Sequence, residues 1–212
     1  MKDQKDLTHV LSENQYFPRV DYFIASAGAT CIILEQYESF QKMSYRNRCT
    51  IFGSNGPIDL SIPLVRGREQ RKLITQVEID NSTDWRTRHL RSIQSSYAKA
   101  PFFEYYFDAI EGLIRNPTSK LFEFNLQVLK WLVKVLKLNC TIELSTTYEH
   151  EPTDVLDLRN KFLPRNRLAS SERSLEYYQV FQDRFGFQPN LSIIDLLFNE
   201  GPAATRLLQS PK

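Results

Sequence analysis

Two loops in the N-terminal half of the sequence carry amides, aromatic rings, a carboxylate and guanidinium groups. Their candidate ligand-binding and catalytic residues are Gln15, Tyr16, Glu35, Arg46, Asn47 and Arg48. Arginine holds carboxylates and phosphates through paired hydrogen bonds, and Glu35 is a candidate general base. These residue types indicate a cleft for an anionic ligand, although Arg46 and Arg48 also fit ordinary strand positions at the surface.

A histidine lies on one face of the helix that is predicted to begin at Trp85. His89 shares that face with Ile93 and Tyr97, and histidine can act as a general base near neutral pH. The same spacing suits a half-buried histidine that is bonded to a backbone carbonyl. Arg88, beside His89, is a candidate for a second contact to an anion.

The last predicted helix, 191–199, is apolar on almost every face but carries one stripe of polar residues. Ser192, Asp195 and Asn199 form this stripe at helical spacing. Because a buried carboxylate is costly without a partner, Asp195 either ties the helix to an arginine elsewhere or lines the ligand cleft. The sequence leaves both interpretations open, and they are compatible.

The elements that flank the two loops predict where the loops meet. Residues 7–11 are a possible strand, apolar residues recur at helical spacing over 20–27, and 31–34 form a short apolar run. This order predicts a compact βαβ unit with parallel strands. Ligands of such units usually lie beyond the carboxyl ends of the strands, which is where both loops begin.

The stretch 48–79 predicts antiparallel strands. Residues 48–52 and 58–64 flank a Gly-Ser-Asn-Gly-Pro turn signal and predict a hairpin. Alternating apolar residues over 73–79 predict a third antiparallel strand. The basic residues between them fit a solvated loop better than a phosphate-binding track. We therefore expect an α/β fold with a small Rossmann-like mixed sheet, in which the N-terminal βαβ unit joins the antiparallel hairpin strands.

The C-terminal half is predicted to be mainly helical. Helical spacing extends over 85–100, 103–116 and 119–136, and a further strand is predicted over 141–146. The segment 149–176 is polar and weakly patterned. It is a long surface loop, a lid or a partner-binding arm.

The composition argues against several classes of function. The 212 residues suit one domain over 1–212, and the 7 Gly form no phosphate-loop motif. A net charge of +2 without a clustered basic field does not favour nucleic acid as a partner. The 3 Cys and 3 His show no metal-ligand spacing, so no metal site is predicted. Without a signal core or a stretch long enough to span a bilayer, we expect a cytoplasmic protein.

Several of these stretches, taken in order, resemble the WbqC-like family of bacterial proteins. The matching stretches are Gln15-Tyr16-Phe17-Pro18 with Tyr22-Phe23, Tyr45-Arg46-Asn47-Arg48, Asn55-Gly56 with Ile62-Pro63, Ile79-Asp80-Asn81, 85–89, 97–101 and 190–199. The sequence departs from the family at Asn14-Gln15, where the family often begins with Gln-Pro. It also has only the short polar segment 149–176 where longer members carry a Ser-Gly-containing stretch.

The resemblance implies a role in bacterial surface-polysaccharide synthesis, including O-antigen, through transfer of glycine or a similar acyl group onto a sugar or nucleotide-sugar. Loop placement and residue type, rather than the resemblance, make His89 or Glu35 the group that we expect to take the proton from the attacking group. The residues that we expect to bind ligand are Gln15, Tyr16, Tyr22, Arg46, Asn47, Arg48, Arg88, Tyr97, Asn190, Ser192 and Asp195. The expected partners are this sugar and an acyl donor, with a homo-oligomer as a further possibility, and no cofactor is identified.

A non-catalytic module that binds or assembles a protein or glycan partner is the alternative. It would use the segment 149–176 and exposed aromatic residues, and the lack of a recognisable nucleophile motif favours it. An enzyme requires a concave pocket in which the candidate Arg, His and Asp side chains converge.

Overall fold

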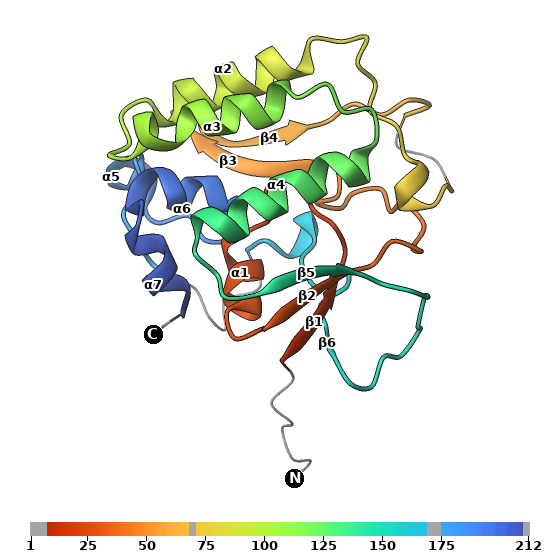
Figure 1. Cartoon of the computed structure of the whole chain (residues 1–212). Helices are drawn as coiled ribbons and strands as arrows, with labels where there is room; N and C mark the ends of the chain where they lie inside the picture. The colour runs from red at the N-terminus through yellow and green to blue at the C-terminus, as the bar shows by residue number, and fades with distance from the viewer. Residues whose placement is uncertain (1–7, 68–70, 169–174, 210–212) are drawn as a thin grey trace.

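The computed structural model describes residues 8–67, 71–168 and 175–209, and one of its sheets consists of four parallel strands (Figure 1). The strands are β1 His9–Ser12, β2 Cys31–Leu34, β5 Thr141–Leu144 and β6 Leu156–Asp157, in the order β5-β2-β1-β6. Helix α1, Val20–Ser26, connects β1 to β2. The predicted parallel βαβ unit is therefore confirmed, and the loops after all four strands leave the same edge of the sheet.

The two faces of this parallel sheet differ in burial. Val10 and Ile32 are register partners on one face and are almost completely buried. On the other face, Leu11, Ile33 and Glu143 are neighbours in register, and burial decreases from Leu11 to the exposed Glu143. The second face therefore stays partly open near β5.

The predicted hairpin is present and forms a sheet of its own. Strands β3 Arg48–Gly53 and β4 Gly56–Ser61 pair with each other in an antiparallel register and make no ladder with the parallel sheet. The α/β class with a parallel unit and an antiparallel hairpin is thus confirmed. The expected single mixed sheet is not formed, because the hairpin strands pair only with each other.

The predicted third antiparallel strand over 73–79 is wrong. Its centre is a 3-10 helix, η1 Ile74–Gln76, flanked only by isolated bridges. The backbone of this segment bonds elsewhere, because the Ile74 amide donates to the Glu38 carbonyl and the Ile79 amide donates to the Ser119 carbonyl. Its apolar pattern buries Ile74, Val77 and Ile79 without strand pairing.

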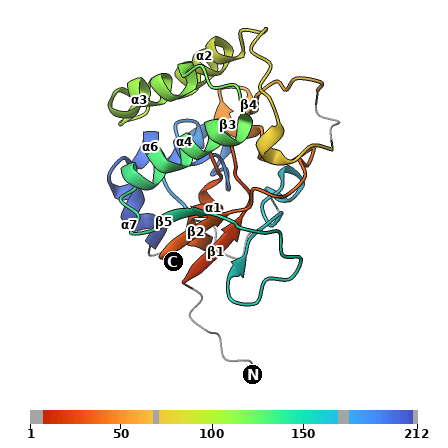
Figure 2. The same ribbon diagram turned by 45° about the vertical axis from the view of Figure 1, so that its right-hand side comes forward.

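Helices fill the space around the two sheets (Figures 1 and 2). They are α2 Trp85–Tyr97, α3 Phe103–Arg115, α4 Leu121–Val135, α5 Gln182–Phe185, α6 Ile193–Glu200 and α7 Ala203–Gln209, together with the 3-10 helix η2 Pro164–Asn166. In both views α4 lies between the hairpin layer, with α2 and α3, and the parallel sheet. Its buried polar residue Asn125 is thereby placed beside the loops that follow the parallel strands.

Part of the segment 149–176 belongs to the parallel sheet. Strand β6 pairs with β1 through Val10 opposite Leu156 and Leu11 opposite Asp157. Residues 169–174 lie outside the described part of the chain. A two-residue strand has no periodicity, which is why the sequence did not predict β6.

Within the described residues, no helix combines the length and the apolar character needed to cross a bilayer. The same part of the chain contains no group of three or more His, Cys, Asp or Glu side chains placed to hold a metal ion. Cys31 and Cys49 are buried free thiols.

Candidate functional site

Polar side chains follow the carboxyl ends of all four parallel strands. Glu13 follows β1, Glu35 follows β2 and Ser145 follows β5, and Arg159 and Asn160 come shortly after β6. Glu13 and Glu35 are at most 1% exposed. The chain runs from β1 outward to β2 and β5 but returns to the other side of β1 for β6, and open α/β sheets bind ligands at such a reversal.

Glu35 is held in place by donors from two neighbouring loops. The Ser145 hydroxyl and the Tyr37 amide each donate to Glu35 Oε1 at 2.8 Å. Arg159 Nη1 lies 3.4 Å from Glu35 Oε2, and the arginine is also paired with Asp157. The carboxylate is therefore fixed in orientation at the end of β2.

Glu13 and Arg46 extend this network across the sheet edge. Glu13 accepts hydrogen bonds from the Asn160 amide and from Gln15 Nε2, both at 2.9 Å. Arg46 donates to Asn160 Oδ1 at 3.0 Å and forms a two-pronged ion pair with Glu38. Burial raises the pKa of Glu38, while the hydrogen bond and charge of Arg46 oppose that rise.

Four buried polar atoms at this edge have no hydrogen-bond partner. They are Asn14 Oδ1, Gln15 Oε1, Asn125 Oδ1 and Arg46 Nη1. A buried polar group without a partner costs about 1–3 kcal/mol, and such groups are uncommon in folded proteins. The four atoms belong to connected residues in the polar interior behind the strand ends, and none of these residues lines either cavity at this edge.

Two cavities open at the same edge. One, of about 330 Å³, lies over the partly open sheet face and is lined by Leu11, Ile33, Glu35, Glu143, Leu144, Ser145, Thr146, Thr147, Glu149, Pro152, Thr153, Asp154 and Val155. The other, of about 430 Å³, is lined by Tyr37, Glu38, Ser39, Phe40, Gln41, Tyr148 and His150. Carboxylates outnumber cations among these linings, so the cavities suit hydroxyl groups or an amine more than an anion.

His89 lies apart from both cavities at the sheet edge. Its Nε2 is 3.2 Å from the Ser61 carbonyl oxygen, which can only accept, so Nε2 carries the hydrogen and Nδ1 accepts from the Tyr16 hydroxyl at 3.0 Å. Burial lowers the pKa of His89 to about 4, against the hydrogen bond to Ser61. The ring is thus neutral at pH 7, with both nitrogens engaged.

Asp195 and Tyr97 meet in a second buried cluster. The hydroxyls of Tyr97 and Tyr177 donate to the two oxygens of Asp195 at 2.8 and 2.6 Å, and Gln179 Nε2 donates at 3.0 Å. The sequence left open whether Asp195 ties the helix to an arginine or lines the ligand cleft. No arginine is among these three partners of Asp195. Burial raises the pKa of Asp195 to about 6, and the three hydrogen bonds oppose the rise.

The remaining predicted ligand-binding residues lie in structural contacts. Asn47 Nδ2 donates to the Ile62 carbonyl, and the Ser192 hydroxyl donates to the Phe17 carbonyl. The Tyr22 hydroxyl is bonded to Ser12, and Asn190 Nδ2 donates to the Arg167 carbonyl.

Two predicted arginines lie outside the sheet-edge network. Arg48 lies 3.6 Å from an oxygen of Asp59, and Arg88 is exposed on α2. The fold brings the predicted residues together in three separate places: Gln15, Glu35 and Arg46 at the sheet edge, Tyr16 with His89, and Tyr97 with Asp195. The candidate Arg, His and Asp side chains therefore do not converge in one pocket.

Sequence reasoning missed Glu13, Glu38, Asn125, Ser145 and Arg159. Glu13 had a usable signal, since it comes two residues after the predicted strand 7–11. Ser145 had a weaker one, because it lies inside the predicted strand 141–146 and follows a strand only in the folded chain, where β5 ends at Leu144. Arg159 had none, because it lies in a weakly patterned segment whose short strand is visible only in the folded chain.

Comparison with known proteins gives a family and one curated relative. A model of the WbqC-like protein family matches residues 14–180 and 162–207. The chain is similar to the uncharacterized protein Rv1507c of Mycobacterium tuberculosis, with 26% identity over 224 residues that cover 93% of this chain and 95% of that protein. No solved structure matches this chain.

Proposed function

We propose a function for this chain from the premise that it belongs to the WbqC-like protein family. It is a cytoplasmic transferase that moves glycine or a similar acyl group onto a sugar or nucleotide-sugar for a bacterial surface polysaccharide. The sugar binds at the carboxyl edge of the parallel sheet, between the loops that follow β1, β2, β5 and β6.

The convergence of the four strand ends carries this proposal. Glu13, Glu35, Ser145 and Arg159 come from four separate loops and meet in one buried network. Hydrogen bonds to charged groups are stronger than those between neutral groups, so carboxylates at this edge hold the hydroxyl or amino groups of a sugar well.

Glu35 acts as the general base in this proposal. The sugar hydroxyl or amine attacks the acyl carbonyl carbon, its proton passes to Glu35, and the bond to the donor's leaving group breaks. Glu35 lines the cavity of about 330 Å³, and its bonds to Ser145 and Tyr37 keep it pointed in one direction. A positioned general base typically contributes about 10²- to 10⁴-fold to the rate.

The test combines ligand binding with product detection. Thermal unfolding of the wild type is measured with glycine, amino sugars, nucleotide-sugars, and acyl and aminoacyl donors, and mass spectrometry then detects an acylated sugar. A ligand at about 100 times its Kd adds about 2.7 kcal/mol of stability. We expect Glu35→Gln to retain sugar binding but to lose about 100-fold or more of the rate.

The matched control is Glu123→Gln, which removes one exposed carboxylate on α4. It should leave both binding and rate unchanged. Full turnover in Glu35→Gln would refute the role of Glu35. If no sugar or donor stabilised the wild type, the transferase proposal as a whole would fail.

Two exposed tyrosines favour the alternative of a glycan-binding module without catalysis. Tyr37 and Tyr148 are 43% and 42% exposed and both line the cavity of about 430 Å³. Exposed rings at a polar cavity combine an apolar face with a polar tip, a combination that suits binding of a sugar ring. Sugar binding that is lost in Tyr148→Ala, with no acylated product from any donor, would favour this module over the transferase.

A further inference from the structure

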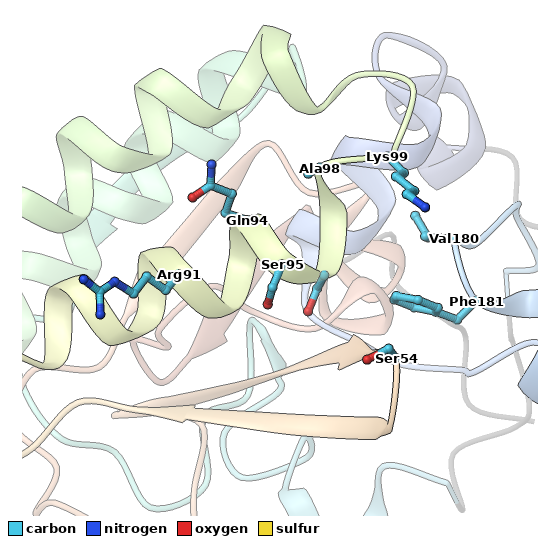
Figure 3. A pocket seen from close by; sticks show the side chains of 9 residues that line it. Ser54, Arg91, Gln94, Ser95, Ala98, Lys99, Val180 and Phe181 are labelled. Carbon is cyan, nitrogen blue, oxygen red and sulfur yellow. The ribbon is translucent and has the colours of Figure 1, made fainter.

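A cavity of about 520 Å³ lies in the other layer of the fold, beside the C-terminal half of α2. It is lined by Ser54, Arg91, Gln94, Ser95, Ser96, Ala98, Lys99, Val180 and Phe181. In Figure 3, Ser54 of the hairpin turn and Ser95 of α2 lie between Arg91 at one end and Lys99, Val180 and Phe181 at the other. None of these residues belongs to the network at the parallel-sheet edge.

The charge of this cavity is opposite to that of the sheet edge. Arg91 and Lys99 are cationic, and no Asp or Glu lines the cavity. Within the part of the chain that the structure describes, neither side chain forms an ion pair. A third cation, Arg184, lies near Ser54 of the lining, because its Nη1 donates to the Ser54 carbonyl at 2.9 Å. The cavity therefore favours an anion.

A buried hydroxyl group adds a second, independent indication of a ligand. Ser96 is 3% exposed, lines the cavity, and its Oγ has no hydrogen-bond partner. The hairpin backbone lies close to it, because a Cβ on Gly53 would be 3.2 Å from Ser96 Oγ. A hydroxyl held in this way without a partner is costly, and an anionic oxygen in the cavity would accept its hydrogen.

The spacing and the apolar end indicate the kind of anion. Arg91 lies within α2, and Lys99 lies two residues beyond the end of α2 at Tyr97, at the other end of the cavity (Figure 3). Two cations at opposite ends suit an anion with more than one charged group, such as a diphosphate, better than a single phosphate. Phe181 and Val180 form an apolar wall at the Lys99 end. Nucleobases stack on aromatic side chains of this kind.

We propose that this cavity binds a nucleoside diphosphate group. The diphosphate lies between Arg91 and Lys99 against the serine hydroxyls, and the base lies on Phe181. A free nucleotide, a nucleotide-sugar and coenzyme A all carry such a group. The proposal stands apart from the function proposed for the sheet edge, because it uses none of the same residues.

Isothermal titration calorimetry on the full chain at low salt tests the proposal. The probes are UDP, ADP, UDP-glucose, coenzyme A, pyrophosphate and inorganic phosphate. We expect at least one nucleotide to bind with a Kd below about 1 mM, and inorganic phosphate to bind at least about tenfold more weakly. Tighter binding of UDP-glucose than of UDP identifies a nucleotide-sugar site, and tighter binding of coenzyme A than of ADP identifies a coenzyme A site.

Variants separate this site from general attraction between charges. The double variant Arg91→Ala/Lys99→Ala should weaken nucleotide binding about tenfold or more, because hydrogen bonds to charged groups are strong. The control Lys130→Ala/Lys134→Ala removes the same charge from exposed positions on α4 and should leave the affinity unchanged. Equal losses in both double variants, or no nucleotide binding at all, would overturn the proposal.

Two single variants test the base and the hydroxyl separately. Phe181→Ala should weaken nucleotide binding but leave pyrophosphate binding as in the wild type. Ser96→Ala should keep the melting temperature of the free protein or raise it, because it removes an unpartnered buried group, and yet it should weaken nucleotide binding. A Ser96→Ala variant that binds as the wild type does would show that the hydroxyl does not face the ligand.

Discussion

Asp195→Asn replaces a buried carboxyl group with a neutral group of the same shape. Asp195 is 1% exposed and accepts hydrogen bonds from Tyr97, Tyr177 and Gln179. Burial raises its pKa from 3.8 to about 6, and the three donors only partly oppose that rise. The folded chain therefore holds the Asp195 proton more tightly than the unfolded chain does.

The raised pKa makes the free energy of unfolding depend on pH. The contribution of Asp195 is fully present below the unfolded pKa of 3.8 and is lost as the pH rises through about 6. A shift of about two units corresponds to about 3 kcal/mol. His89 acts in the opposite direction over nearly the same window, because burial lowers its pKa from 6.5 to about 4 and stability is lost as the pH falls. The two effects largely cancel in the wild type.

The difference in unfolding free energy between the wild type and Asp195→Asn isolates the contribution of the Asp195 carboxyl group, because the contribution of His89 is the same in both proteins. Urea unfolding of both proteins at pH 4 and pH 8 gives this difference. We expect the wild type to lose about 2 kcal/mol relative to the variant between pH 4 and pH 8, because the unfolded carboxyl group is already more than half ionised at pH 4. The new amide also faces Gln179 with a second donor, which adds a constant offset of about 1 kcal/mol. A difference that is the same at both pH values, within about 0.5 kcal/mol, would refute the raised pKa.

Three further substitutions test other parts of the structure. His89→Gln should remove the loss of stability that His89 causes at low pH. The wild type should therefore lose about 3 kcal/mol of unfolding free energy relative to the variant as the pH falls from 7 to 4. Thermal unfolding of both proteins across that pH range measures this loss. Glu38→Ala should lower the free energy of unfolding in urea by about 3–5 kcal/mol, because it leaves Arg46 buried without its ion pair. The double variant Glu38→Leu/Arg46→Met should be close to the wild type in stability. Equal losses of stability in the single and the double variant would contradict this account. Gly201→Ala should lower the free energy of unfolding by about 2–4 kcal/mol, since Gly201 has a φ of +52° and a Cβ there would lie 2.4 Å from the Phe102 ring. A loss of stability below about 1 kcal/mol in calorimetry would contradict the close approach of Gly201 to Phe102.

Local patterns in the sequence were sufficient to predict the N-terminal unit. The apolar run 31–34 and the helical spacing over 20–27 predict a parallel βαβ unit, because each pattern depends on residues close together in the chain. The hairpin over 48–61 follows from its turn signal for the same reason. The alternation over 73–79 gave a wrong prediction, because the backbone there forms a 3-10 helix and only isolated bridges, at Leu73, Glu78 and Ile79, and no ladder with a strand.

The candidate site depends on contacts that the sequence does not reveal. The Asn160 amide meets Glu13, and Ser145 meets Glu35, across more than a hundred residues of chain. The rule that ligands lie beyond strand ends predicts Glu35 and Gln15 but not Arg159, which pairs with Glu35. Periodicity placed His89 on a buried helix face, but only the fold brings Tyr16 and the Ser61 carbonyl to its two nitrogens.

The most direct test of the central claim is to map sugar binding by backbone amide chemical shifts in NMR. The wild-type chain is titrated with D-glucosamine and then with glycine, and the perturbed amides are assigned. If the carboxyl edge of the parallel sheet is the binding site, the shifts concentrate at Glu13, Glu35, Ser145 and Asn160, which lie in the four loops that follow the parallel strands. Shifts confined to the cavity beside α2, or spread over the surface without a maximum at the sheet edge, would contradict the account.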